Sequence, residues 1–129
     1  MRLISAILAL FLAATAAWAL GEPHTLLSGV EATGAGAPAG LTGSTFTAAV
    51  EFTNSGGSVT ALTVAIEGSL DGTKWFALAT HTLTAGELSA GQAMFHITNK
   101  YVRFVRANIT TLTETGTTAV TVKISPEAY

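Results

Sequence analysis

The sequence predicts an all-β protein, an antiparallel β-sandwich of jelly-roll or immunoglobulin-like type with about seven strands behind a hydrophobic N-terminal segment. Several segments alternate apolar and polar residues with a period of two, which indicates strands with one buried face. These segments recur about every ten residues, separated by turn residues, and no helical periodicity follows the N-terminal segment. The chain is also rich in threonine, whose branched Cβ favours strands.

The first segment has the features of an export leader. Arg2 supplies positive charge, residues 3–20 carry none, and the segment ends in an A-x-A motif at Ala17 and Ala19. Cleavage after Ala19 would release residues 1–19 as a signal peptide. The alternative is a retained hydrophobic helix, although the uncharged stretch is short for the roughly 20 residues that span a bilayer. We therefore expect a secreted or cell-surface protein that contacts a membrane only if the leader is retained.

Residues 20–43 are predicted to form an N-terminal arm, and residues 44–129 the sandwich domain. The stretch 34–40 contains mainly glycine and alanine, a composition typical of flexible linkers, so it is interpreted as a hinge. Such an arm could add a strand to a neighbouring chain, with its apolar residues filling pockets there. The alternative is that the arm is the first strand of its own sheet. The predicted assembly residues are Leu26, Leu27 and Val30.

The sandwich strands follow from alternation. In the first of them Phe46, Ala48 and Val50 share one face, and in the second Leu62 and Val64 do so. The expected strands are 44–53, 60–69, 74–80, a short one near 81–83, 92–98, 101–109 and 118–124, with loops at 84–91 and 111–117.

A β-hairpin is predicted around Asp71 and Gly72, because Asp-Gly between apolar runs is a strong signal for a type I′ turn. If these two residues are the whole loop, Gly68 faces Trp75 across the hairpin. Trp75 would then cover the gap that the glycine leaves, which we favour over an exposed platform for a sugar.

Two arginines interrupt the apolar strand 101–109. An unpaired buried charge is costly, so at least one of Arg103 and Arg106 is expected to pair with a carboxylate. Glu67 is the expected acid, and Arg103 is assigned as its partner.

The composition excludes several function classes. The 129 residues fit one domain, charged residues make up 11% of the chain, and the net charge of −2 argues against nucleic-acid binding. The chain has no cysteine, and His24, His81 and His96 lack the spacings typical of metal sites. No G-x-S-x-G motif is present. We therefore expect a protein that is not an enzyme, with no catalytic, cofactor-binding or metal-binding residues.

The run from Val64 to Trp75 (VAIEGSLDGTKW), followed by Tyr101-Val102-Arg103, resembles a small β-sandwich module found in surface proteins of tailed phages and in secreted bacterial proteins. The same pieces are distantly similar to strands of discoidin-type carbohydrate-binding domains, although the long first half of those domains is missing. The resemblance covers most of residues 25–124. It implies a non-catalytic module displayed on a surface.

Low charge, hydroxyl-rich strands and open sheet edges favour association. The leading hypothesis is a secreted structural protein that assembles with itself, as a filament or surface layer, through β-strand contacts. The alternative is an extracellular carbohydrate-binding or adhesion module, which would bind surface glycans through the loops near residues 54–58, 84–91 and 111–117 and lose that binding when Trp75 or Tyr101 is changed to alanine. Expected partners are therefore copies of the chain itself or surface glycans.

Overall fold

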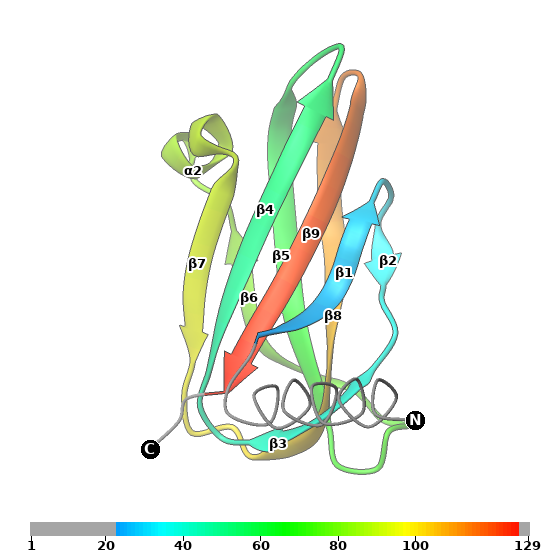
Figure 1. Cartoon of the computed structure of the whole chain (residues 1–129), viewed down its shortest axis with the longest axis vertical. Coiled ribbons are helices and arrows are strands. Elements are labelled where there is room, and N and C mark those ends of the chain that lie inside the picture. The colour runs from blue at the N-terminus through cyan, green and yellow to red at the C-terminus, as the bar shows by residue number, and fades with distance from the viewer. Residues whose placement is uncertain (1–22, 127–129) are drawn as a thin grey trace, which may run out of the picture.

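Nine strands and one short helix make up residues 23–126, the part of the chain that the computed structural model describes (Figure 1). The predicted leader, with Ala17 and Ala19, lies outside the described residues. The elements are β1 (His24–Val30), β2 (Gly34–Ala35), β3 (Ala39–Gly43), β4 (Phe46–Ser55), β5 (Val59–Ser69), β6 (Phe76–Thr82), α2 (Ala85–Ala90), β7 (Gln92–Ile97), β8 (Val102–Glu114) and β9 (Thr117–Pro126).

The strands form two antiparallel sheets packed face to face, which confirms the predicted sandwich. One sheet has the order β1-β9-β4-β7 and the other β2-β8-β5-β6, with β3 also paired to β8. Successive strands cross repeatedly between the sheets. If β2 and β3 are counted as one interrupted edge strand, this is the eight-stranded order of a jelly roll.

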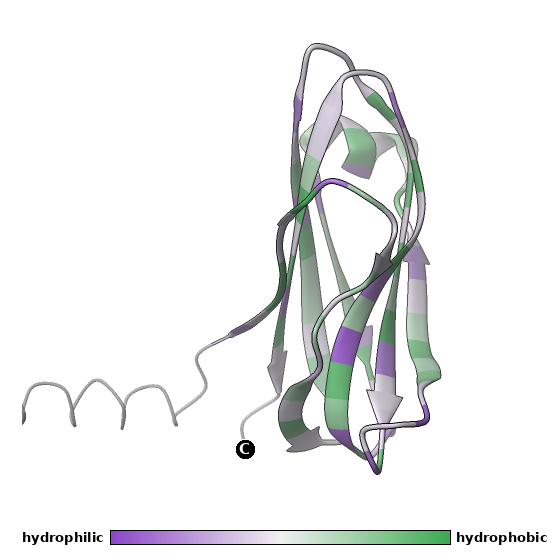
Figure 2. Cartoon of the chain, turned by 90° about the vertical axis from the view of Figure 1, so that its right-hand side faces the viewer, coloured by the Kyte–Doolittle hydropathy of each residue, from purple (hydrophilic) through white to green (hydrophobic). Residues whose placement is uncertain are grey.

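The core lies between the sheets and consists of alternate residues, as predicted for the central strands. Figure 2 shows this alternation as bands of hydrophobic and hydrophilic colour along the strands. Burying these side chains is the main favourable term in the fold. The most completely buried include Phe46, Val50, Leu62, Val64, Ile66, Val120, Val122 and Ile124.

The described part of the predicted arm belongs to this same sandwich, so the arm prediction is wrong. Strand β1 pairs with β9, from His24 opposite Ile124 to Val30 opposite Val120. Leu26 and Leu27 are both 6% exposed within the core, and Val30 packs against it.

Irregular pairing explains why two adjacent leucines can both be buried. The register of β1 on β9 shifts between Thr25 and Leu27, and such a bulge turns successive side chains toward the same face. The stretch interpreted as a hinge has a packing role. A Cβ on Gly36 would lie 2.3 Å from Leu27 Cδ2 and 2.9 Å from the carbonyl oxygen of Leu26.

The hairpin between β5 and β6 is longer than predicted. Residues 70–75 form the loop, so Gly68 pairs with Phe76 rather than with Trp75. Gly72 does take the positive φ expected of it, +80°. The loop is long because Asp71 binds backbone groups within it, which replaces the tight two-residue turn.

Residues 84–91, predicted as a loop, contain the helix α2. Thr84 and Glu87 form a capping box, in which the Glu87 N–H donates to Thr84 Oγ1 and the Thr84 N–H donates to Glu87 Oε1. Gly91 ends the helix in the left-handed conformation. No helix in residues 23–126 is long and apolar enough to cross a membrane.

Candidate functional site

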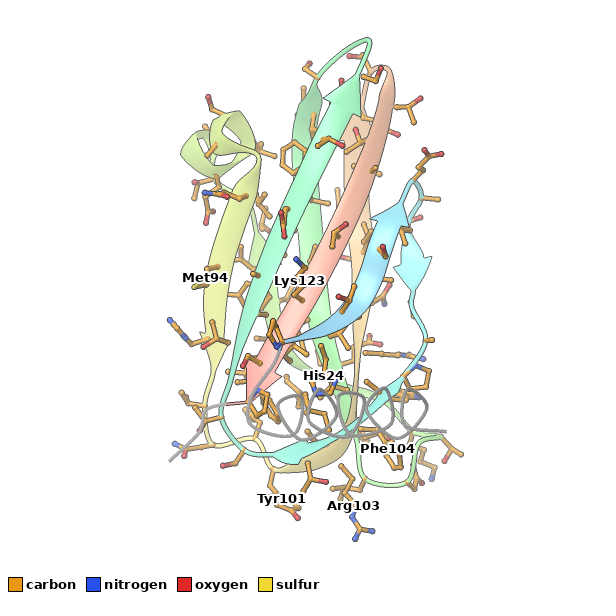
Figure 3. All side chains as sticks on the ribbon, in the orientation of Figure 1. His24, Met94, Tyr101, Arg103, Phe104 and Lys123 are labelled. Carbon is orange, nitrogen blue, oxygen red and sulfur yellow. The ribbon has the colours of Figure 1, made fainter. Side chains whose placement is uncertain are left out.

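A groove of about 480 Å³ opens at one end of the sandwich, a size typical of ligand sites. The loop between β5 and β6 forms one wall and the loop between β7 and β8 forms the other. The two loops meet because the end of β5 pairs with the start of β8, Ser69 lying opposite Phe104. Figure 3 shows Tyr101 and Arg103 projecting at this end of the molecule.

Exposed apolar side chains gather around the groove. Leu70, Phe76 and Tyr101, which line it, are 62%, 68% and 63% exposed. Among the described residues, the other large hydrophobic side chain this exposed is Met94, 63% exposed on β7 and away from the groove (Figure 3). Single exposed apolar residues are common, but a group of them around one groove is typical of a binding surface.

The floor of the groove is closed by close packing around Gly68. A Cβ on Gly68 would lie 2.6 Å from Val102 Cγ1 and 2.8 Å from Leu78 Cδ1. Trp75 was predicted to cover the space beside Gly68, but Val102 and Leu78 fill that space.

Asp71 holds the first wall in shape. Its Oδ1 accepts hydrogen bonds from the N–H groups of Thr73 (2.9 Å) and Lys74 (3.0 Å) and from the Ser69 hydroxyl (3.0 Å). The backbone N–H groups of Lys74 and Thr73 stabilise the charged form and hold the pKa of the Asp71 carboxyl well below its usual range. Ser69 Oγ in turn accepts the N–H of Gly72 at 2.9 Å. The sequence correctly pointed to Asp71 as a turn residue.

The second wall is fixed by one residue in a special conformation and one backbone bond. Asn99 has φ +57°, in the left-handed region that asparagine tolerates better than most residues. Next to it, the Lys100 N–H donates to the Ser44 carbonyl at 3.0 Å. Both walls are therefore formed before any ligand arrives, which lowers the entropy cost of binding.

The predicted ion pair of Glu67 with Arg103 is wrong, because Arg106 is the partner. Arg106 lies directly opposite Glu67 in the β5–β8 ladder, so both side chains leave the sheet on the same face. Arg106 Nε donates to Glu67 Oε1 at 2.6 Å, and Asn108 Nδ2 donates to Glu67 Oε2 at 3.3 Å. Arg103 is exposed.

Trp75 also belongs to this cluster. The Arg106 guanidinium carbon lies 4.4 Å from the centroid of the Trp75 ring, a cation–π contact. Trp75 therefore covers an ion pair on the outer face of the sheet rather than a glycine.

The histidines of the sandwich have structural contacts. His81 Nε2 lies 3.0 Å from Glu87 Oε1, and its ring stacks on Phe95 with 5.1 Å between centroids. His96 Nδ1 lies 3.0 Å from Thr47 Oγ1. Across residues 23–126, no three His, Asp or Glu side chains come together as a metal site would require.

Sequence reasoning did not identify most of the groove. The loops expected to bind glycan, 54–58, 84–91 and 111–117, do not line the groove. Tyr101 is a predicted test position that does line it, whereas Leu70, Phe76, Lys74 and Lys100 are lining residues that the sequence did not indicate. One signal in the sequence could have indicated the groove: in both loops a large apolar residue is next to, or close to, turn residues.

Comparisons with known proteins find only distant similarity. No family model and no curated protein matches the chain. A CBM4 module has 18% identity over 83% of this chain and 71% of its own length, with a TM-score of 0.47. The CBM22-1 and GH10 modules of endo-1,4-β-D-xylanase 10B from Clostridium thermocellum, solved with xylohexaose, have 14% identity over 84% and 26%, with a TM-score of 0.43.

A mitogen derived from Yersinia pseudotuberculosis has 12% identity over 84% of this chain and 86% of its own, with a TM-score of 0.39. The class of the chain, a jelly-roll β-sandwich, rests on its own strand order. The sequence resembles a small β-sandwich module, and of that resemblance the sandwich architecture is confirmed.

Proposed function

We propose that this chain is a non-enzymatic module, displayed outside the cell, that binds saccharides in the groove between the β5–β6 and β7–β8 loops. The observation that carries the proposal is the gathering of exposed Leu70, Phe76 and Tyr101 around one preformed groove. The extracellular location rests on the leader expected at residues 1–19.

The groove offers the two kinds of contact that a sugar needs. The rings of Phe76 and Tyr101 present apolar faces on which the C–H face of a sugar ring can stack, and the Tyr101 hydroxyl adds a polar tip. Asn99, also in the lining, supplies a polar amide group for hydroxyl recognition. A ligand lying along the groove would contact both walls.

Truncating the rings tests this proposal. Tyr101→Ala and Phe76→Ala are expected to weaken binding to immobilised polysaccharides at least about fivefold, which corresponds to the cost of over 1 kcal/mol that marks the important residues of an interface. Met94→Ala is the matched control, because Met94 is as exposed as Tyr101 but lies on β7. If no polysaccharide binds, or if Met94→Ala weakens binding as much as Tyr101→Ala, the proposal is wrong.

A second candidate function, self-association, is supported by the free edge of β7. The Phe52 N–H donates to the Gly91 carbonyl, so the alternation of an antiparallel ladder turns the N–H and C=O groups of Gln92, Met94 and His96 away from β4. The β4–β7 register is regular over its whole length, and β7 carries no lysine or proline. Strands β1 and β6, at other sheet edges, pair irregularly, as protected edges do.

Two β7 strands could therefore pair antiparallel about a two-fold axis through Met94, which would join two sheets into one. Met94→Lys should reduce any dimer measured by analytical ultracentrifugation, because an edge lysine opposes strand pairing. Thr53→Lys, on the outer face of the central strand β4, is the control and should leave the dimer intact. A dimer unaffected by Met94→Lys, or a wild-type chain that is monomeric at high concentration, would contradict this candidate.

A further inference from the structure

We infer that the groove selects acidic saccharides, those with carboxylate or sulfate groups, over neutral ones. The inference rests on the proposed function and adds the chemical class of its ligand. It comes from the placement of charge, an observation independent of the exposed rings.

The unpaired cations of the described residues gather at the groove. Lys123 pairs with Glu51 at 3.4 Å, and Arg106 pairs with Glu67. No other lysine or arginine between residues 23 and 126 has an ion-pair partner. Those left without a carboxylate are Lys74 and Lys100, which line the groove, and Arg103, which projects at the same end (Figure 3).

The acidic residue of the groove does not neutralise these cations. The Asp71 carboxylate is directed to the backbone N–H groups of its own loop, and no ion pair joins it to the Lys74 ammonium group. Among the other carboxylates of residues 23–126, those of Glu67 and Glu51 are paired with Arg106 and Lys123. Glu31 follows the end of β1 that pairs with the start of β9, Glu114 is at the opposite end of β8, and Glu87 is in α2 before β7, whereas the groove loop comes after β7. Counting the residues that the structure describes, the groove end therefore carries an excess of positive charge, on a chain whose net charge is −2.

This arrangement fits an amphipathic anionic ligand. Stacking on Phe76 and Tyr101 holds the ring of a sugar, while Lys74 and Lys100, one on each wall, can reach acidic substituents on either side of it. Lysine suits this role because its ammonium group is a compact charge on a flexible stem. Arg103, outside the groove, lets the next unit of a polymer make a further contact. A positive end also steers anionic chains toward the site.

Matched polysaccharide pairs test the inference on the full chain. The first pair is polygalacturonate and its methyl ester, and the second is dextran sulfate and dextran; members of each pair differ in charge. We expect the acidic member of at least one pair to bind about tenfold more tightly, and added salt to reduce that difference. The double variant Lys74→Gln/Lys100→Gln should lose roughly three- to tenfold for the acidic member and little for the neutral one.

The control is Lys123→Gln, the same charge change on the other sheet, which should leave binding unchanged. Equal binding within both pairs, or an equal loss in the control, overturns the inference; if saccharides still bind through Tyr101, the proposed function stands. Absence of binding to all four polysaccharides overturns both. Binding to anionic lipid vesicles, but to no polysaccharide, would also overturn both and point to a membrane surface.

Discussion

Two glycines, Gly36 just before the edge strand β3 and Gly40 within it, have different surroundings. Gly36 and Gly40 lie in the same Gly/Ala-rich stretch, so composition treats them alike. In the fold they differ. Leu27 and the Leu26 carbonyl crowd the position of a Cβ on Gly36, whereas nothing lies within 4 Å of one on Gly40.

Gly36→Ala should therefore destabilise the protein by about 1–3 kcal/mol, the usual cost of overpacking. Gly40→Ala, which meets open space, should change the free energy of unfolding by less than about 0.5 kcal/mol. Urea unfolding followed by tryptophan fluorescence measures both. A flexible hinge would make the two variants equivalent, so equal stabilities contradict the packing role of Gly36.

The Asp71 carboxylate should make stability depend on acid pH. Its pKa is lowered in the folded state, so it adds stability above its unfolded pKa of about 3.9, and that contribution is lost as the pH falls below this value. Asp71→Asn keeps an acceptor oxygen but removes the titration. The wild-type urea midpoint should therefore fall more between pH 7 and pH 2.5 than the variant midpoint; parallel pH profiles would show that Asp71 contributes nothing.

Strands were predicted better than loops, for a physical reason. Strands such as β4 and β9 alternate buried and more exposed residues, because each packs one face on the core, and periodicity reveals that directly. Strand β1 bulges to bury two adjacent leucines, which hides its period. The end of β8 is threonine-rich and exposed, so the predicted strand stopped at residue 109 while the real one continues to Glu114.

The β1 segment gives a direct test of its place in the sandwich. Leu27→Ala should cost about 2–5 kcal/mol of unfolding free energy, as buried leucine truncations do. The same change at Leu70, which is 62% exposed, should cost less than about 0.5 kcal/mol. A Leu27→Ala variant as stable as Leu70→Ala would show that the segment is not part of the core in solution.

The groove could not be read from the sequence, because it belongs to the assembled sandwich. Its walls are separated along the chain and meet only because the end of β5 lies beside the start of β8. Local rules identified Asp71 and Gly72 as turn residues, and a resemblance drew attention to Tyr101. Lys74 and Lys100 line the same groove only because distant segments pair as strands, and one sequence does not reveal that pairing.

The molecule as a whole has different properties at its two ends. One end gathers exposed apolar rings and unpaired cations, and the other carries α2 and the hairpins that join β4 to β5 and β8 to β9. The central core makes the sandwich a rigid support, so ligand contacts should be confined to the two groove loops.

Chemical-shift mapping by NMR tests this location most directly. On titration with an oligogalacturonate or a sulfated dextran oligosaccharide that binds, the backbone amides of residues 69–76 and 99–103 should show the largest shifts, while those of α2 and the outer face of β4 stay unchanged. Shifts concentrated on α2, on the outer face of β4, or around Trp75 and Arg106 without the 99–103 loop would place the binding site elsewhere and contradict the groove as the functional site.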